Sequence, residues 1–199
     1  MLYLILDCTN KSKRSLKNIC SKCEVDLIQL RDKVHPKSEV LNFACVLSKY
    51  LVASKTLFII NDYVDVAKSC NADGVHLGQT DTSIKKARTI LGKNKIIGIS
   101  CHSVSQALKA QKEGADYIGI GPVFATPTKP EYKAIGLKIL SQLKGKIKIP
   151  YFAIGDISKE NVEDVIASGA SRIAVARAIL KSNHPKEVAN RLNKLLRAQ

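Results

Sequence analysis

The sequence predicts an α/β protein, and more specifically a single closed (β/α)8 TIM barrel, from three observations. Short apolar runs of strand length alternate with longer segments of helical period, eight times in succession. Strands that alternate with helices form a parallel sheet, and eight such units close that sheet into a barrel. The strands are apolar throughout rather than at every second position, as expected when helices cover the sheet.

The eight strands are predicted at 2–6, 27–30, 57–60, 74–77, 96–99, 117–120, 151–154 and 172–175. The helices are predicted at 13–22, 37–53, 64–70, 83–91, 103–113, 136–144, 158–168 and 186–197. Ser83, and Ser158 together with Asn161, stand where helix N-caps are expected. Gly114 and Gly169 stand where two helices should end. No change in composition marks a linker, so residues 1–199 are interpreted as one domain rather than an open doubly wound sheet, for which no edge strand is evident.

The composition is that of a globular protein with an excess of positive charge. The chain has 199 residues and a net charge of +15, which favours anionic partners. The lysines are scattered and few aromatic residues accompany them, so we expect no nucleic-acid binding. No apolar run is long enough to span a membrane, and the apolar N-terminus lacks a basic leader, so we expect a cytoplasmic protein without a membrane partner.

The six cysteines do not predict a metal or redox site. Cys20 and Cys23 form the only close pair, and no second pair or histidine follows at metal-binding spacing. Because the pair falls within a predicted helix, both are interpreted as small, partly buried helix residues. Free thiols agree with the expected reducing compartment.

Charged residues follow the second predicted strand. Gln29, Arg31 and Lys33 are spaced two apart, so on a strand they share one face, while Leu30 and Asp32 share the other. Arg31 can bind phosphate oxygens through two parallel hydrogen bonds, and Lys33 adds a compact charge. Solvated charges at a strand end are the alternative interpretation.

Two aspartates follow neighbouring strands. Asn61 and Asp62 come directly after the third predicted strand, and Asp81 follows the fourth. The carboxyl ends of barrel strands meet at one face, where Ser100 also ends the fifth strand. Mg2+ is commonly held by one or two carboxylates together with waters and substrate phosphates. We therefore expect Asp62 and Asp81 to hold Mg2+ beside a phosphorylated substrate, although capping of the next helix by Asn61 and Asp62 is an alternative.

The longest strand–helix connection contains Thr126, Pro127, Thr128 and Lys129. Two hydroxyl groups and a lysine in such a loop fit a lid over an anionic substrate. A surface turn stiffened by proline is the alternative. His76 and His102 also follow strands, where each could be an acid–base group or a partly buried histidine that bonds a carbonyl.

Taken together, these motifs resemble the thiamine-phosphate synthase (thiamine-phosphate pyrophosphorylase) family. The matching stretches cover nearly the whole chain in order; they are 29–33, 60–62, 72–79, 97–100, 115–124, 126–129, 153–155 and 178–179. The resemblance implies a (β/α)8 enzyme, a transferase that condenses hydroxymethylpyrimidine diphosphate with a thiazole phosphate through a pyrimidine carbocation, with release of diphosphate.

The resemblance also implies roles for individual residues. Catalytic roles fall to Arg31, Lys33, Ser100 and Lys129, which with Gln29, Leu30, Asp32 and Asn61 would bind the pyrimidine diphosphate. Asp62 and Asp81 would bind Mg2+, and Thr126, Pro127 and Thr128 would contact the thiazole phosphate. The sequence allows a homo-oligomer without fixing one.

Two positions depart from the family pattern. Asp156 stands where the family usually has the second glycine of Gly-Gly-Ile, and Ala176-Arg177 stand where a phosphate-binding serine is usual. The loops after strands seven and eight are the usual phosphate site of such barrels. Asp156 would repel a phosphate and Arg177 would attract one, so we predict that the two side chains pair and leave some Arg177 donors for the ligand.

Two other functions use the same scaffold. A thiazole tautomerase, related to this family, would employ His102 as an acid–base group and would not need the cations that grip a diphosphate. A non-catalytic phosphometabolite-binding protein would retain the pocket without turnover, which fold alone does not exclude. Magnesium-dependent release of diphosphate separates these functions from a synthase.

Overall fold

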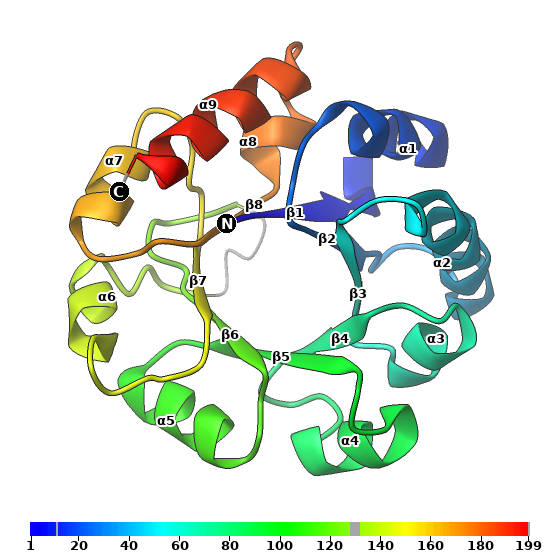
Figure 1. The fold of residues 1–199 in the computed structure, drawn as a ribbon, viewed down its shortest axis with the longest axis horizontal. Helices are drawn as coiled ribbons and strands as arrows, with labels where there is room; N and C mark the ends of the chain where they lie inside the picture. Colours follow the sequence, from blue (N-terminus) through cyan, green and yellow to red (C-terminus); the bar gives the residue numbers. More distant parts are fainter. Residues whose placement is uncertain (11, 128–131, 199) are drawn as a thin grey trace.

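The computed structural model, which describes residues 1–10, 12–127 and 132–198, confirms the predicted barrel (Figure 1). Its strands pair in parallel in chain order, and β8 pairs with β1 to close the sheet. The strands are β1 (Leu2–Asp7), β2 (Leu27–Arg31), β3 (Leu57–Asn61), β4 (Gly74–Leu77), β5 (Ile96–Cys101), β6 (Tyr117–Ile120), β7 (Tyr151–Ile154) and β8 (Ile173–Val175).

Helices surround the barrel on its outside (Figure 1). They are α1 (Lys13–Lys22), α2 (Lys37–Leu51), α3 (Val64–Ser69), α4 (Ile84–Leu91), α5 (Val104–Lys112), α6 (Lys138–Leu143), α7 (Val162–Ala167), α8 (Arg177–Leu180) and α9 (Pro185–Arg197), with a short 3-10 turn at Cys8–Asn10. None of the helices in the described part of the chain is long and apolar enough to cross a membrane.

The alternation of side chains along each strand separates the core into two layers. On β1, Leu2, Leu4 and Leu6 point outward and pack beneath the helices. Tyr3 and Ile5 point into the barrel, where they join a smaller cluster that includes Tyr117, Phe152 and Ala174. The inner cluster fills the barrel interior below its carboxyl-terminal face.

Carboxylates fix the opposite face of the barrel. Asp26, Asp73 and Asp116 each precede an even-numbered strand, and each accepts a backbone N–H from the preceding odd-numbered strand at 2.7 Å. The register of β1, β3 and β5 is thereby fixed at the face that carries no predicted site residue, where barrels place residues for stability.

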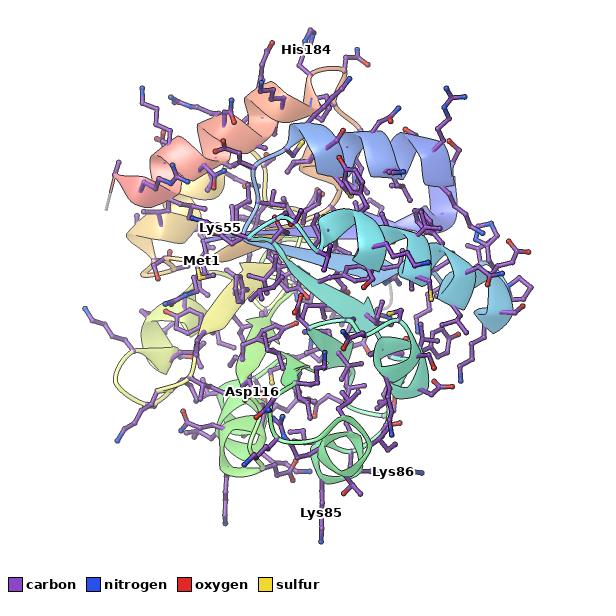
Figure 2. The ribbon with its side chains drawn as sticks, turned by 45° about the vertical axis from the view of Figure 1, so that its right-hand side comes forward. Met1, Lys55, Lys85, Lys86, Asp116 and His184 are labelled. Atoms are coloured by element: carbon purple, nitrogen blue, oxygen red, sulfur yellow. The ribbon has the colours of Figure 1, made fainter. Side chains whose placement is uncertain are left out.

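The surface charges agree with the interpretation of scattered lysines. Lys85 and Lys86 project outward from α4, away from the barrel interior (Figure 2).

Cys20 and Cys23 are buried, and both thiols are free. Burial raises the pKa of Cys20 to about 12, which leaves this thiol protonated and unreactive.

The structure differs from the sequence predictions at one of two helix caps and in one additional short helix. Ser83 caps α4 and accepts the Lys86 N–H at 3.3 Å, as expected. Ser158 and Asn161 do not cap α7 with their side chains; Asn161 instead bridges the preceding loop by accepting from Ser158 N and donating to Asp156 O. The sequence also did not predict α8, because four residues are too few to produce a helical period.

Candidate active site

A pocket opens at the carboxyl-terminal ends of the strands, above the inner cluster that contains Tyr3, Tyr117 and Phe152. Its lining comes from all eight strands and from the connections that follow β5, β6, β7 and β8. The sequence predictions placed Gln29, Arg31, Asn61, Ser100 and Thr126 at this face, and all five line the pocket. Their convergence follows from the closed parallel sheet, which brings the same end of every strand to one rim.

A chain of hydrogen bonds crosses the floor of the pocket. Gln29 Nε2 donates to the Tyr3 hydroxyl at 2.6 Å, and that hydroxyl lies 2.8 Å from the hydroxyl of Tyr117. The Tyr117 hydroxyl is 2.9 Å from His76 Nδ1, and His76 Nε2 is 2.9 Å from Ser100 Oγ. We call these five residues the relay; it links β2 to β5 through the barrel interior.

The relay depends on the glycine at position 98 in β5. A Cβ atom on Gly98 would lie 2.1 Å from Cζ of the Tyr117 ring, so only glycine leaves room for the phenol. Burial raises the pKa of both Tyr3 and Tyr117 above the usual range for a phenol. Both phenols therefore remain neutral, and each keeps one proton to donate.

Arg31 is paired across the neighbouring strand. Asp7 and Arg31 are register partners in the β1–β2 pair, and their side chains form an ion pair with only 14% of each exposed. Arg31 also lines a second, adjoining compartment of the site together with Lys33, Arg177 and Lys181. Four cationic side chains at one rim, with Asp7 as a counter-charge, provide a place for a polyanion.

Lys33 and Asp62 form a second ion pair, beside Asp81. Burial raises the pKa of Asp62 above its usual range; Lys33 opposes this effect, and the nearby Asp81 carboxylate adds to it. Asp81 itself accepts the Gly78 N–H at 2.7 Å. Two carboxylates from the ends of β3 and β4 thus lie close enough to repel each other, an arrangement that a divalent cation would relieve.

The helix-capping alternative for Asn61 and Asp62 finds no support in the described contacts. The N-cap position of α3 is Tyr63, and no side-chain hydrogen bond caps this helix. Asp62 has a φ of 62°, a left-handed conformation that turns its side chain back toward Lys33 rather than along the helix.

The predicted pairing of Asp156 with Arg177 is confirmed. Arg177 Nη1 lies 3.4 Å from Asp156 Oδ1, and about a third of each side chain is exposed. Arg177 Nε and Nη1 are buried and make no hydrogen bond with a described group. No described group satisfies these buried donors at the rim of the pocket, which costs free energy unless another acceptor is supplied.

The connection after β6 packs tightly against β7. A Cβ atom on Gly121 would lie 2.1 Å from Ile154 O, and one on Gly155 would lie 2.5 Å from Pro122 Cα.

His102 Nδ1 lies 2.5 Å from Gly121 O, and the His102 ring stacks on Tyr132 with ring centroids 4.4 Å apart. Bonding to a carbonyl, one of the two interpretations of His102, is therefore confirmed.

Two predicted substrate residues face away from the pocket. Leu30 is buried in the outer core under the helices. Asp32 is 3% exposed and accepts the backbone N–H groups of Val34 and His35. Burial disfavours its charge, but these bonds and the His35 ring hold the pKa of Asp32 below its usual range.

The remaining predicted residues lie at the rim or outside the described residues. Pro127 lines the adjoining compartment, and Ala176 lines both compartments. Asp156 and Arg177 line the main pocket. Thr128 and Lys129 lie outside the described residues.

Sequence reasoning missed three site residues and misplaced one. Tyr3 and Tyr117 were taken only as parts of strands, although a phenol in an apolar strand needs a hydrogen-bond partner when it is buried. Asp7 lay just beyond the predicted first strand and was given no role. His76 does not follow β4 but lies within it, and it bonds Tyr117 and Ser100. The inward position of His76, two residues after Gly74, was the available signal.

Comparison with known proteins gives a consistent result. The model of a protein family described as "Thiamine monophosphate synthase" matches residues 2–179. A thiamine-phosphate synthase of Clostridium acetobutylicum is 41% identical over 191 residues, which cover 94% of this chain and 90% of the relative. A thiamine-phosphate synthase of Gloeobacter violaceus is 46% identical over 159 residues; this match covers 80% of the chain but only 47% of that longer relative.

Solved structures give the same result for the fold. A thiamine phosphate pyrophosphorylase from Pyrococcus furiosus superposes with a TM-score of 0.88 at 34% identity, covering 99% of this chain and 95% of the other. The likeness extends over the whole barrel, including the strands and loops that form the pocket described above.

Proposed function

Because the chain belongs to the thiamine monophosphate synthase family, we propose that it joins hydroxymethylpyrimidine diphosphate to a thiazole phosphate, giving thiamine phosphate and diphosphate. It is an enzyme, a transferase of the thiamine-phosphate synthase type. The observation that carries the proposal is the cationic rim, which places Arg31, Lys33 and Arg177 around one pocket. Because both substrates carry phosphate groups, the reaction requires cationic side chains at two positions along this rim.

The reaction is a substitution at the methylene carbon of the pyrimidine. The bond from this carbon to the diphosphate oxygen breaks, and its electron pair leaves with the diphosphate. The lone pair of the thiazole nitrogen then forms the new carbon–nitrogen bond. Since negative charge develops on the leaving group, fixed cations such as Arg31 and Lys33 lower the barrier.

A carboxylate holds each of the two cations Arg31 and Lys33 at the rim. Asp7 pairs with Arg31, and Asp62 pairs with Lys33. These partners restrict both cations to the rim before the substrate binds, which reduces the ordering cost of binding. Lys129 and Thr128, outside the described residues, remain proposed contacts of the two substrates.

The chemistry of Asp62 and Asp81 fits Mg2+. Among the described residues no group of three or more acidic, histidine or cysteine side chains forms a complete metal site. Mg2+ does not require one, because it retains waters and takes ligands from substrate phosphates. The raised pKa of Asp62 reflects a buried carboxylate beside another carboxylate, which a cation would stabilise. When bound there, Mg2+ would neutralise charge on the departing diphosphate.

The second substrate fits the part of the rim that follows β7 and β8. Arg177 carries buried donors with no described acceptor, and Asp156 holds its guanidinium at the rim. We assign the thiazole phosphate to this position, with Thr126 and Ala176 beside it. Positioning both substrates over the relay supplies most of what a dissociative substitution requires from the protein.

The proposal needs two small-molecule substrates and neither a nucleic acid nor a membrane. A cytoplasmic location is part of the proposal, supported by six free cysteines, of which five are buried.

The test is product formation from the two substrates with either Mg2+ or EDTA, followed by mass spectrometry. Thiamine phosphate and diphosphate in equal amounts, with Mg2+ only, are the expected result. Lys85→Ala, on the outer face of α4 (Figure 2), is a control that should not change the rate. Binding of the pyrimidine diphosphate without turnover would favour a binding protein, and isomerisation of a thiazole carboxylate phosphate would favour a tautomerase; either would overturn the proposal.

A further inference from the structure

Asp7 and Arg31 end two adjacent strands on the inner side of the barrel. The two residues are register partners at the carboxyl-terminal ends of β1 and β2, and Asp7 follows the inward-facing Tyr3 and Ile5 at alternate positions. The Asp7 carboxylate accepts a hydrogen bond from Arg31 Nη1 through Oδ2. Only 14% of each side chain is exposed, so solvent screens this ion pair less than the pairs on the outer helices.

Thr9 fixes the other oxygen of the same carboxylate. The Thr9 backbone N–H donates to Asp7 Oδ1 at 3.0 Å, and the Thr9 hydroxyl donates to the same oxygen. Because Thr9 belongs to the short 3-10 turn directly after β1, one turn supplies both donors. The carboxylate therefore cannot turn away from Arg31 without breaking its bonds to Thr9.

The ion pair occupies one part of the Arg31 guanidinium and leaves the rest for a ligand. Within the described part of the chain, Asp7 is the only residue that hydrogen-bonds the Arg31 side chain. A guanidinium carries several N–H donors in a fixed planar arrangement. Arg31 lines both the main pocket and the adjoining compartment. The bond to Asp7 therefore decides which of the other Arg31 donors face the space where a diphosphate would lie.

The Asp7 carboxylate opposes the binding of an anion. Asp7 lines the adjoining compartment together with Lys33 and Arg177, so its charge repels a phosphate group that binds there. A carboxylate in this place does not serve affinity. Its contacts with Thr9 and Arg31 fit a role in orientation instead.

We propose that Asp7 is a positioning residue, which Thr9 holds in place and which orients Arg31 toward the departing diphosphate. Oriented donors matter most in the transition state, where negative charge develops on the leaving group. Asp7 acts through Arg31 and not on the reacting atoms. The inference rests on the proposed function, because that function supplies the diphosphate leaving group.

An asparagine at this position cannot make the bonds of the carboxylate. Its amide has one acceptor oxygen, and its nitrogen only donates. If the oxygen faced Arg31, the amide nitrogen would face the Thr9 backbone N–H, which is also a donor. If the oxygen faced Thr9, Arg31 would meet a donor and lose its partner. Asp7→Asn therefore keeps the size of the side chain but disrupts the fixed orientation of Arg31.

Steady-state kinetics with both substrates and Mg2+ compares the wild type with Asp7→Asn, Thr9→Val and Thr9→Ser. We expect Asp7→Asn to lower kcat about tenfold, because Arg31 is no longer oriented in the transition state. The KM for the pyrimidine diphosphate should stay within about threefold, since lost order weakens binding and relieved repulsion strengthens it. Thr9→Val should lower kcat by about threefold, and Thr9→Ser, which keeps the hydroxyl, should restore the wild-type kcat.

Asp65→Asn is the matched control. It also removes a carboxylate from an ion pair, but the pair of Asp65 with Lys37 lies on the outer helices and is exposed. This variant should keep the wild-type kcat and KM.

Other roles of Asp7 predict different results. If the carboxylate only repelled the anion, Asp7→Asn would raise kcat/KM, and the inference would be wrong. An unchanged kcat with a raised KM would indicate a role in binding alone and would also overturn it. If Asp7→Asn does not fold, Thr9→Val and Thr9→Ser make the same comparison, and equal kcat values in these two variants would refute the inference.

Calorimetry with inorganic diphosphate and Mg2+ separates this inference from the proposed function, because it needs no turnover. The effect of Asp7→Asn on the Kd is measured in the wild type and in Arg31→Ala. Without Arg31 only the repulsion is relieved, so Asp7→Asn should tighten binding; with Arg31 present this gain should be smaller by about threefold or more. Equal effects in both backgrounds would refute the inference even if the enzyme is active. Unequal effects in a protein that forms no thiamine phosphate would refute the synthase activity and retain the role of Asp7.

Discussion

Arg177 and Asp156 should have opposite effects on the second substrate. The pair lies at the rim of the pocket with Arg177 Nη1 3.4 Å from Asp156 Oδ1, and the guanidinium retains two buried nitrogens without a described hydrogen bond. Arg177→Ala removes these donors, so we expect the KM for the thiazole phosphate to rise. Asp156→Asn removes the competing charge but keeps a side chain of similar size, so we expect this KM to fall.

The magnitudes follow from the exposure of the pair. A hydrogen bond to a charged group contributes about 1.5–3 kcal/mol. With 35% of the Arg177 side chain exposed, solvent screening favours the lower end of that range, or a roughly tenfold rise in KM. An exposed ion pair contributes about 0.2–1 kcal/mol, so removing the Asp156 charge should lower KM by about 1.4- to fivefold.

Steady-state kinetics with saturating pyrimidine diphosphate measures both effects. The KM for the pyrimidine diphosphate, determined separately, serves as the internal control and should stay within about twofold, since Arg177→Ala leaves Arg31 and Lys33 in place. An unchanged thiazole-phosphate KM in Arg177→Ala, or a rise in Asp156→Asn, would refute the assignment of this substrate to the loops after β7 and β8.

Three other substitutions test the barrel itself. Gly98→Ala places a Cβ 2.1 Å from the Tyr117 ring, so we expect a loss of about 1–3 kcal/mol in urea unfolding. Asp73→Ala leaves the Phe58 N–H without its 2.7 Å acceptor, so we expect a loss of about 1–3 kcal/mol in the same assay and normal KM values in the folded enzyme. Asp32 has a lowered pKa, so the free energy of unfolding that its charge contributes is present at neutral pH and is lost as the pH falls below about 4; the difference between the wild type and Asp32→Asn should shrink over that range.

A specific result would refute each of these three predictions. Normal stability of Gly98→Ala would mean that the Tyr117 ring moves without cost. Asp73→Asn keeps an acceptor oxygen, and equal losses in Asp73→Asn and Asp73→Ala would show that the bond to Phe58 is not the cause. A stability difference for Asp32→Asn that stays constant from pH 7 to pH 3.5 would show that the charge of Asp32 is not what its hydrogen bonds stabilise.

Much of the fold followed from local patterns. Eight apolar runs alternating with helical segments correspond to β1–β8 and their helices, with bounds that differ by a few residues at most for the strands. The alternation along β2 also placed Gln29 and Arg31 on the opposite face from Leu30 and Asp32, as the structure has them. These features depend on the spacing of residues close in sequence, which is visible in the sequence itself.

Partners that come from different strands were harder to predict. The pairing of Asp156 with Arg177 was predicted because both residues departed from one family pattern in neighbouring loops. The pairs Asp7–Arg31 and Lys33–Asp62 were not predicted, since they depend on strand register and on the turn at Asp62. A charged residue can be assigned to a rim from its sequence position, but its partner depends on distances that only the closed barrel sets.

The sequence by itself determined the barrel, the rim on which the site is built and the polar and charged residue types that lie there. Only the tertiary structure decided that Tyr3, Tyr117 and His76 connect Gln29 with Ser100 across the interior. The physical reason is that strand periodicity tells which side chains point inward, whereas closure of the sheet and the space left by Gly98 decide which of them meet.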